Sequence, residues 1–566
     1  MNKKLIYLLS VIFIAGIFSS CSKKMSPLSS DFFTTTPQPL EVIGNNIPVN
    51  ISGNIPPKYF LKNAEMSIIP ILKYESGVIA GETFDYQGEK IQGNNPTISY
   101  EKGGNINMAF SFDYKPEMAS GELYLKARSK VGKKYIDMPA IKVGEGVIAT
   151  SLLSSAYSAN PAIAPDAFQK VIKEKRDADI LFLIQKSELR ASELNKPNVQ
   201  NLQKSMKDAA VTENKRIAGV EVSSYASPDG GLELNQKLAA EREKNTVNYL
   251  NKEMAKSAIS NLPIDAHFTA QDWEGFKDLV EKSNIPDKDL ILRVLSMYSD
   301  PERREKEIKN ISATYKNLAE DILPQLRRSR LTATIEIIGK SDEQISSLAA
   351  STPNALSLEE LLYAATLGKT SDAQADIYRA ATQIYPNDYR AYNNLGALLF
   401  EYGYFKDASD MFTKAISLNP NAPEANMNAG LMALIKGDLI DAQQYFGKSS
   451  GAAELNGALG VLYTMSGSYT QAVNSFGNTK SNNAAVAQIM AKDYNKAKST
   501  LSDISNPDAL SDYLMAIVGA RTNNSSMVIN SLKDAIAKDS SMAKKALNDK
   551  EFYKFAQNAA FQKLIK

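Results

Sequence analysis

The stretch that decides the fold of the C-terminal part runs from Tyr389 to Pro420 and reads YRAYNNLGALLFEYGYFKDASDMFTKAISLNP. Small residues stand at Gly396 and Ala408, where two helices of a hairpin approach closely and a larger side chain would force them apart. Pro420 cannot continue a helix, because its ring removes a backbone donor, so it ends the second helix. The stretch therefore predicts a hairpin of two packed helices.

The spacing within this stretch resembles the tetratricopeptide repeat, a unit of 34 residues that stacks into a solenoid. The matching residues are Tyr392, Leu395, Gly396, Ala408, Phe412, Ala415 and Pro420. Weaker units carry Gly430, Ala442 and Phe446; Gly460, Ala472 and Phe476; Ala497 and Leu501; Val528, Leu532 and Ala535; and, upstream, Ala373, Ile377 and Ala380. Six helix pairs exceed the roughly three repeats that a solenoid needs. We expect an α-solenoid over residues 355–566, with a terminal cap from 541.

The inner face of the first helices of such repeats forms a groove for a protein partner. The residues expected there are Arg390, Asn393, Asn394, Met427 and Asn428. Asparagine amides are suited to bond a peptide backbone. Glu454 and Gly457 stand where a clamp for a free C-terminal carboxylate needs basic residues, so the groove suits an extended or helical segment instead.

Strands and helices alternate in the region before the repeats, which predicts an α/β domain over residues 178–345. The clearest strand after the first helix is Ile217 to Tyr225, and a long helix follows from Leu232 to Ala255. A mainly helical, charged insertion is expected at about 273–326, before a last strand. The full expected order is strand 179–185, helix 198–210, strand 217–225, helix 232–255, strand 264–270, insertion and strand 330–338.

This order resembles the OmpA-like domain that binds peptidoglycan. The helix carries Asn235, Leu238 and Arg242 at the spacing of the family motif. In the family, an aspartate and this arginine hold the amine and carboxylate of diaminopimelate, and an arginine fork meets a carboxylate with two parallel bonds. Here Ser227 occupies the position of the aspartate, and Asp229 lies two residues later.

The resemblance implies a candidate peptidoglycan site made of Arg242, Asn235, Ser227 and Asp229. The departure at Ser227 leaves two interpretations open. In one, Ser227 and Asp229 replace the missing aspartate and the domain binds the cell wall. In the other, the fold lacks that ligand and Arg242 only pairs with a neighbour such as Glu241 or Asp229. A fold does not by itself determine a function.

Short strands separated by turns predict an all-β, sandwich-like domain over residues 39–147. In the clearest strand, Ile106 to Tyr114, apolar and polar residues alternate with a period of two. Leu123, Leu125 and Ala127 continue the pattern in the next strand, which favours an antiparallel sandwich. Residues 148–177 are rich in alanine and serine, and we expect a helical connector there.

The N-terminal residues have the features of an export signal. Lys3 and Lys4 precede an apolar run from Leu5 to Phe18, shorter than the roughly 20 residues that cross a bilayer. Ser19-Ser20-Cys21 follows and resembles the lipobox of bacterial lipoproteins. Lipidation of Cys21, the only cysteine in the chain, explains an unpaired thiol in an exported protein. We expect a signal peptide at 1–20 and a lipidated flexible tether at 21–38.

The composition narrows the function classes. The chain has 65 basic and 63 acidic residues, and this balance argues against nucleic-acid binding. It has one histidine, His267, which argues against histidine-based metal sites and Ser-His-Asp triads. The sequence shows no glycine-rich phosphate loop and no nucleophile elbow. We therefore expect no enzyme activity, no metal and no cofactor.

These features together predict a multidomain lipoprotein of the outer membrane. Cys21 would anchor it, and the basic Lys23 and Lys24 after the cysteine favour the periplasmic face. Its repeats would bind other envelope proteins and support assembly of an outer-membrane complex. The alternative is a peptidoglycan tether that uses Arg242. An envelope enzyme is the third and least favoured class.

Overall fold

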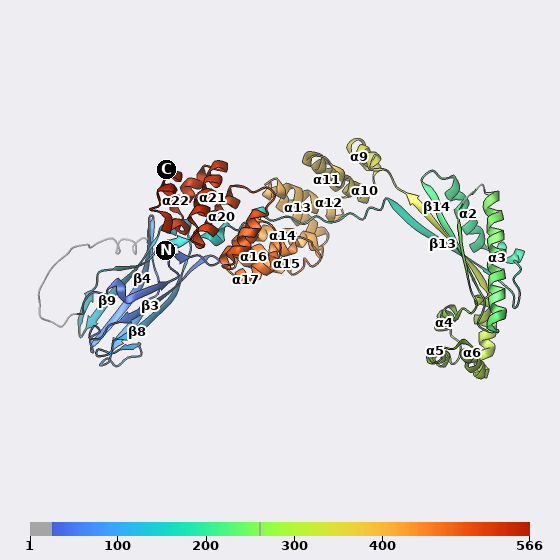
Figure 1. The fold of residues 1–566 in the computed structure, drawn as a ribbon, viewed down its shortest axis with the longest axis horizontal. Coiled ribbons are helices and arrows are strands. Elements are labelled where there is room, and N and C mark those ends of the chain that lie inside the picture. The colour runs from blue at the N-terminus through green and yellow to red at the C-terminus, as the bar shows by residue number, and fades with distance from the viewer. Residues whose placement is uncertain (1–24, 258, 260–261) are drawn as a thin grey trace. The chain divides into compact units, whose positions relative to one another are not determined.

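The computed structural model describes residues 25–257, 259 and 262–566. The predicted signal peptide, Cys21 and the first residues of the predicted tether lie outside these ranges. The chain divides into two compact units (Figure 1): unit 1 combines Met1–Pro165 with Tyr378–Lys566, and unit 2 is Asp166–Ile377. Unit 2 is therefore an insertion in the sequence of unit 1. Among the residues described, no helix has the length and apolar character that a membrane crossing requires.

The N-terminal part of unit 1 is a β-domain in which two sheets share one core, antiparallel except where β6 and β7 pair in parallel. The first sheet has the order β1-β3-β8 and the second the order β10-β9-β4-β6-β7, with β11 beside β9 and β5 beside β4. The short strands β2 and β12 pair in parallel. The bounds are β1 (Phe33–Thr36), β2 (Leu40–Glu41), β3 (Asn46–Ile55), β4 (Ala64–Tyr74), β5 (Gly77–Ala80), β6 (Phe84–Gly88), β7 (Thr97–Ile98), β8 (Gly104–Asp113), β9 (Glu122–Val131), β10 (Lys134–Asp137), β11 (Ile141–Glu145) and β12 (Val147–Ile148).

The alternation read from the sequence decides which side chains enter this core. Ile106, Met108 and Phe112 of β8 are buried, and their neighbours Asn107 and Ser111 are exposed. Leu123, Leu125 and Ala127 of β9 join the same core. The predicted strands and the β-rich N-terminal region are confirmed.

The prediction of a flexible tether up to residue 38 is wrong for its described part. Met25 and Leu28 are only 5% and 4% exposed and belong to the core of the β-domain. The Tyr59 hydroxyl donates a hydrogen bond to the Ser26 carbonyl at 2.7 Å, and β1 pairs with β3. The reason is that the apolar residues scattered among the serines and threonines find a core to cover.

The prediction of a helical connector at 148–177 is also wrong. The structure has two short 3-10 turns, η3 (Thr150–Leu153) and η4 (Ala156–Ser158), and no further helix or strand before β13 (Val171–Leu181). Pro161 and Pro165 oppose a helix, and the helical repeats supply the backbone partners that a helix would have supplied itself. We call residues 150–165 the strap.

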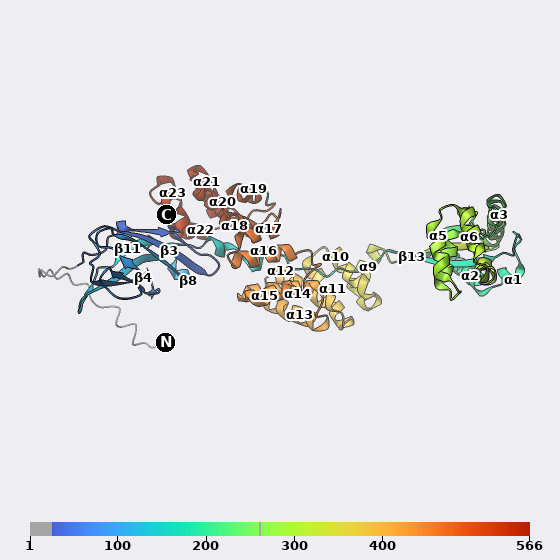
Figure 2. The same cartoon turned by 90° about the horizontal axis from the view of Figure 1, so that it is seen from below.

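The C-terminal part of unit 1 is an array of helix hairpins of the tetratricopeptide type, as predicted, and Figure 2 shows the hairpins following one another. Helices α10 (Leu358–Leu367) and α11 (Ser371–Ile384) precede it in sequence. The hairpins are α12 (Tyr389–Glu401) with α13 (Phe405–Leu418), α14 (Pro423–Lys436) with α15 (Leu439–Phe446), α16 (Leu455–Met465) with α17 (Tyr469–Phe476), α18 (Asn482–Met490) with α19 (Tyr494–Ser502), and α20 (Ala509–Arg521) with α21 (Ser525–Lys538). The cap consists of α22 (Ser541–Asn548), a 3-10 turn (Lys550–Phe555) and α23 (Ala559–Leu564).

Unit 2 holds a four-stranded sheet in the order β13-β16-β14-β15. Strands β14 and β15 are parallel, and β16 is antiparallel to both of its neighbours. Figure 1 shows α2 and α3 beside β13 and β14, and their apolar residues share a core with the sheet. The further bounds are α1 (Ala191–Leu194), α2 (Pro197–Val211), β14 (Lys215–Tyr225), α3 (Leu232–Lys256), β15 (Ile264–Thr269) and β16 (Arg328–Ile338).

The element order of unit 2 is the one that the sequence predicted, including the helical insertion before the last strand. The insertion packs around a cluster of its own that includes Phe276, Ile291 and Leu326. Two features differ: β13 begins at Val171 and ends at Leu181 rather than at Gln185, and the short helix α1, which the sequence did not predict, precedes α2. The insertion comprises α4 (Trp273–Lys282), α5 (Lys288–Met297), α6 (Pro301–Asn310), α7 (Ser312–Asn317), a π-helical turn (Leu318–Ile322) and α8 (Leu323–Leu326), and α9 (Asp342–Ser351) follows β16.

Within unit 1, a buried arginine ties the β-domain to the end of the repeats. Arg521 of α20 lies 2.5 Å from the Glu41 carboxylate and 2.6 Å from that of Glu551. Burial opposes the charge on Arg521, but the two carboxylates outweigh it and raise its pKa above the ordinary value. Thr150, at the start of the strap, donates to Glu551. The strap is thereby fixed at its beginning.

The close packing of the hairpins leads to a first prediction. A Cβ atom at Gly396 would lie 2.7 Å from the Phe412 ring, whereas one at Gly457 would meet nothing within 4 Å. We expect Gly396→Val to lower the free energy of unfolding by about 2 kcal/mol through overpacking. The matched control Gly457→Val should change it by less than about 0.5 kcal/mol. Urea unfolding followed by circular dichroism measures both, and equal effects would contradict the packing argument.

Candidate functional site

Two asparagines occupy the same place in consecutive repeats. Asn394 of α12 and Asn428 of α14 are 34 residues apart (428 minus 394), and each lies two residues before the small glycine of its helix, Gly396 or Gly430. Because the glycines face the second helices of their hairpins, the register turns both asparagines toward the strap. The repeat period thus places two identical amides along one groove.

Each of these asparagines holds one residue of the strap by both of its backbone groups. The Asn394 Oδ1 accepts a bond from the Ala164 N–H at 2.8 Å, and its Nδ2 donates to the Ala164 carbonyl at 2.9 Å. Asn428 binds Ala162 in the same way, at 2.7 and 2.8 Å. Alternate residues of an extended chain turn their backbone groups to the same side. Consecutive repeats therefore bind strap residues two positions apart.

Asn393 connects the two clamps into one network. Its Nδ2 donates to the Ala162 carbonyl at 2.9 Å and to the Asn394 Oδ1 at 3.1 Å. Its own Oδ1 accepts a bond from Asn428 at 2.9 Å. All three asparagine side chains are at most 2% exposed. A buried amide without partners is costly, so a complete network of this kind stabilises one position of the strap.

A third asparagine clamp holds the other end of the strap. Asn483 of α18 accepts a bond from the Ser155 N–H at 2.8 Å and donates to the Ser155 carbonyl at 2.9 Å. The Tyr157 ring meets the edge of the Phe405 ring at 4.7 Å between centroids. Ala156 and Ala162 belong to the core of the repeats. The strap is thus bound along the groove as a peptide ligand would be.

The structure brings together some of the predicted groove residues and separates others. Asn393, Asn394 and Asn428 line the groove, where they bond a peptide backbone, the chemistry expected of them. Met427 is fully buried in the core of the repeats, and Arg390 pairs with Asp388 at 3.0 Å. The prediction of a partner at these residues is corrected, because the strap, a segment of the same chain, covers the asparagines that were expected to bind it.

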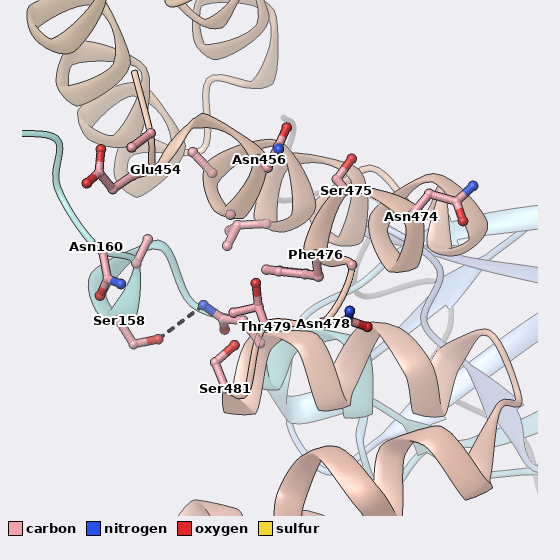
Figure 3. Close-up of a pocket in the computed structure, with 17 residues that line it drawn as sticks. Ser158, Asn160, Glu454, Asn456, Asn474, Ser475, Phe476, Asn478, Thr479 and Ser481 are labelled. Atoms are coloured by element: carbon pink, nitrogen blue, oxygen red, sulfur yellow. Dashed lines mark hydrogen bonds between the residues drawn. The ribbon is translucent and has the colours of Figure 1, made fainter. Parts of the chain in front are cut away.

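The series of clamps is interrupted in the third repeat. Ala458 stands two residues before Gly460, where the first two repeats have asparagine. A hollow of about 540 Å³ lies at this point, between strap residues 158–160 and the helices α16 to α18. Figure 3 shows Ser158 and Asn160 of the strap on one side and Asn456 and Ser475 on the other. Two of its lining residues, Glu454 and Gly457, were expected only to rule out a clamp for a free carboxylate. The alanine at the asparagine position is the feature of the sequence that could have indicated a hollow here.

The candidate peptidoglycan residues lie in unit 2, and Arg242 is the most buried of them. It is 1% exposed, and its guanidinium donates to the carbonyls of Lys186, Tyr225 and Leu183 at 3.0, 2.8 and 3.4 Å. Burial and, to a lesser extent, the nearby Arg327 lower the pKa of Arg242 to about 10, although Asp229 acts in the opposite direction. Its donors are directed at the chain's own backbone rather than at a surface.

Asp229 is paired with a different arginine. Arg327, just before β16, lies 2.9 Å from the Asp229 carboxylate and donates to the Ser227 hydroxyl at 3.2 Å. Ser227 donates in turn to Asp229. Asn235 donates to the carbonyls of Ser227 and Gly230 at 2.9 and 3.0 Å, which fixes this turn. The structure therefore groups the four candidates around one turn, with their polar atoms bonded to each other or to the backbone.

Arg327 and Arg328 lie where the helical insertion ends and β16 begins. Both are 8% exposed, and Arg328 lies 2.8 Å from Asp272. Paired carboxylates compensate the two charges that the fold buries. The sequence alone indicated the burial of these two arginines only weakly, because adjacent arginines at a helix end are usually exposed.

The part of the chain that the structure describes contains no group of three or more His, Cys, Asp or Glu side chains arranged to hold a metal ion.

No family model and no curated protein sequence matches the chain. Among solved structures it is similar to a tetratricopeptide repeat protein from Parabacteroides merdae, with 17% identity, coverage of 36% of this chain and 88% of that chain, and a TM-score of 0.28. It is similar to PilW, a type IV pilus biogenesis factor, with 14% identity, coverage of 40% of this chain and 100% of that chain, and a TM-score of 0.28. It is also similar to yeast Tom70, with 12% identity, coverage of 59% of this chain and 78% of that chain, and a TM-score of 0.26. At such low identities and TM-scores these likenesses carry no argument, and the repeat assignment rests on the hairpins themselves.

The clamps lead to a second prediction. In the double variant Asn394→Ala, Asn428→Ala, the buried backbone groups of Ala164 lose their side-chain partners, and those of Ala162 keep only Asn393. We expect the amides of residues 162–164 to exchange with deuterium about tenfold faster or more, because leaving a buried backbone group without a partner costs about 1–3 kcal/mol. Asn421→Ala, in an exposed loop, is the matched control. Unchanged protection in the double variant would show that the clamps do not hold the strap.

A third prediction concerns Arg242. Arg242→Met removes the donors of three backbone carbonyls, and we expect it to lower the stability of unit 2 by about 3 kcal/mol. Arg330→Met, which breaks a half-exposed pair with Asp179, should cost less than about 1 kcal/mol. Trp273 is the only tryptophan of the chain and lies in unit 2, so its fluorescence during urea unfolding reports on this unit. An Arg242→Met protein as stable as wild type would show that the arginine is not structural.

Proposed function

We propose that this chain is a non-enzymatic scaffold of the bacterial envelope that binds other envelope proteins through its helical repeats. The observation that carries the proposal is the series of asparagine clamps at Ala164, Ala162 and Ser155. Amide side chains that bind both groups of a peptide unit recognise a protein backbone. The groove of the repeats is therefore chemically suited to protein segments, although the strap already fills most of it.

Lipid anchoring belongs to the same proposal. It is supported by the basic start, the apolar run and the lipobox-like Ser19-Ser20-Cys21 in the sequence. A multiply acylated cysteine would anchor the chain stably, since each buried CH₂ adds about 0.8 kcal/mol. We place the protein at the outer membrane, facing the periplasm, where it would support assembly of a membrane complex. Its lone histidine and the lack of a nucleophile motif favour a role without catalysis.

The contacts of Arg242 and Asp229 favour a structural role for unit 2 over a peptidoglycan tether. The element order of unit 2 and the positions of Asn235 and Arg242 agree with the resemblance. A diaminopimelate ligand, however, would need the Arg242 guanidinium that three backbone carbonyls already occupy. It would also need the Asp229 carboxylate that Arg327 pairs with. We therefore favour the scaffold over the tether.

The anchoring can be tested in cells fed a palmitate analogue that can be labelled. We expect the wild-type chain to carry the label and to sediment with membranes, and Cys21→Ser to lose both properties. The matched control is Ser22→Ala, next to the cysteine, which should keep the label. Met25→Ser would not serve as a control, because Met25 is buried and its replacement would disturb the fold. A labelled Cys21→Ser protein would contradict the lipobox interpretation.

Partner binding can be tested by crosslinking the full chain in its own cells. Photoreactive residues at exposed positions of the second helices, such as Gln444 and Asp410, and at Asn456 in the hollow should give reproducible adducts with the same envelope proteins. A chain that forms no adducts from any position would contradict the scaffold.

Co-sedimentation of the full chain with purified peptidoglycan tests the tether, by comparing the wild type with Arg242→Lys. Peptidoglycan binding by the wild type that the variant loses would favour the tether.

A further inference from the structure

The hollow in the third repeat continues the groove at the place where the strap is not clamped. Strap residues 158–160 pass it, and Ala458 stands where the first two repeats have the asparagine that binds the strap backbone. Here Asn483 donates a hydrogen bond only to the Ser158 hydroxyl, at 3.3 Å. Asn160 is exposed. The hollow is thus a gap in a groove that binds peptide backbone on both sides of it, at Ser155 and at Ala162.

Amide side chains line this gap from several elements. Asn160 comes from the strap, Asn456 from α16, Asn474 from α17 and Asn478 from the loop after it (Figure 3). Each amide offers donors and an acceptor. Within the described residues, none of these four side chains has a hydrogen-bond partner, in contrast to the clamping asparagines. They match the alternating donors and acceptors of a peptide backbone.

The charge of the hollow restricts what it can bind. Glu454 is the only charged side chain among the lining residues, and its carboxylate makes no ion pair or hydrogen bond within the described residues. The nearby Lys480 is paired with Asp503 at 2.9 Å. The only aromatic lining residue, Phe476, is 4% exposed, so there is little flat surface for a ring to stack on. An anionic ligand is disfavoured, and a cationic group opposite Glu454 is favoured.

We propose that the hollow binds an extended segment of a partner protein that carries a lysine or arginine. The asparagines hold its backbone, as Asn428 and Asn394 hold the strap, and Glu454 pairs with its basic side chain. This inference rests on the proposed scaffold function and narrows it, since it names the surface and the kind of segment. Strap residues 158–160 form one wall, so the partner binds beside the strap and does not displace it.

The test uses the full chain and three fluorescent peptides in which alanine alternates with lysine, with glutamine or with glutamate. We expect the lysine peptide to bind most tightly and the glutamate peptide most weakly, measured by fluorescence anisotropy. Glu454→Gln should weaken the lysine peptide by about fivefold, as a partly exposed ion pair does, and leave the glutamine peptide unchanged. Equal binding of the three peptides, or no binding of the lysine peptide, would overturn the proposal.

A second variant fills the hollow without disturbing the fold. A side chain at Gly457 enters open space, so Gly457→Tyr should abolish binding of the lysine peptide at unchanged thermal stability. Gln444→Tyr puts the same ring on the exposed side of α15 and should bind like wild type. If Gly457→Tyr binds normally, the hollow is not the site. Adducts from Gln444 in cells, together with no peptide binding, would leave the scaffold standing and reject only this site.

Discussion

The architecture of unit 1 depends on one interaction, the hydrogen bonding of asparagine amides to the backbone of the strap. An extended segment leaves its N–H and C=O groups without partners, and burying them is costly unless another group bonds them. Asn394, Asn428 and Asn483 supply those bonds at three points. Without them the strap would have to form a helix or remain in solvent, and its alanines could not join the core of the repeats.

The clamps also decide what the groove can do. The asparagines of the groove bond backbone groups, and the groove has room only for small side chains at Ala162 and Ala164, which are 0% and 1% exposed. The segment it holds is covalently part of the chain and is therefore present at a high effective concentration. A free peptide is at a disadvantage against it. The surface left for partners is the part that the strap does not cover, which includes the hollow at the third repeat.

Unit 2 illustrates how a familiar arrangement of elements can keep its shape while its polar groups take structural roles. Arg242 stabilises three backbone carbonyls, and Asp229 compensates the buried charge of Arg327. Each of these groups is expensive to bury alone and is therefore paired. A motif that resembles a ligand site in sequence is here directed into the domain.

The sequence by itself determined the local elements: the period of two in β8, the hairpin marked by Gly396, Ala408 and Pro420, and the order of strands and helices in unit 2. These follow from periodicity and from residues with few conformations, which act over short distances. Only the tertiary structure decided that residues 150–165 form two short 3-10 turns and an irregular strap instead of a helix. It also decided that Met25 and Leu28 are buried, and which arginine pairs with Asp229. Those outcomes depend on partners up to hundreds of residues away, such as Asn428 for Ala162, and no local pattern records them.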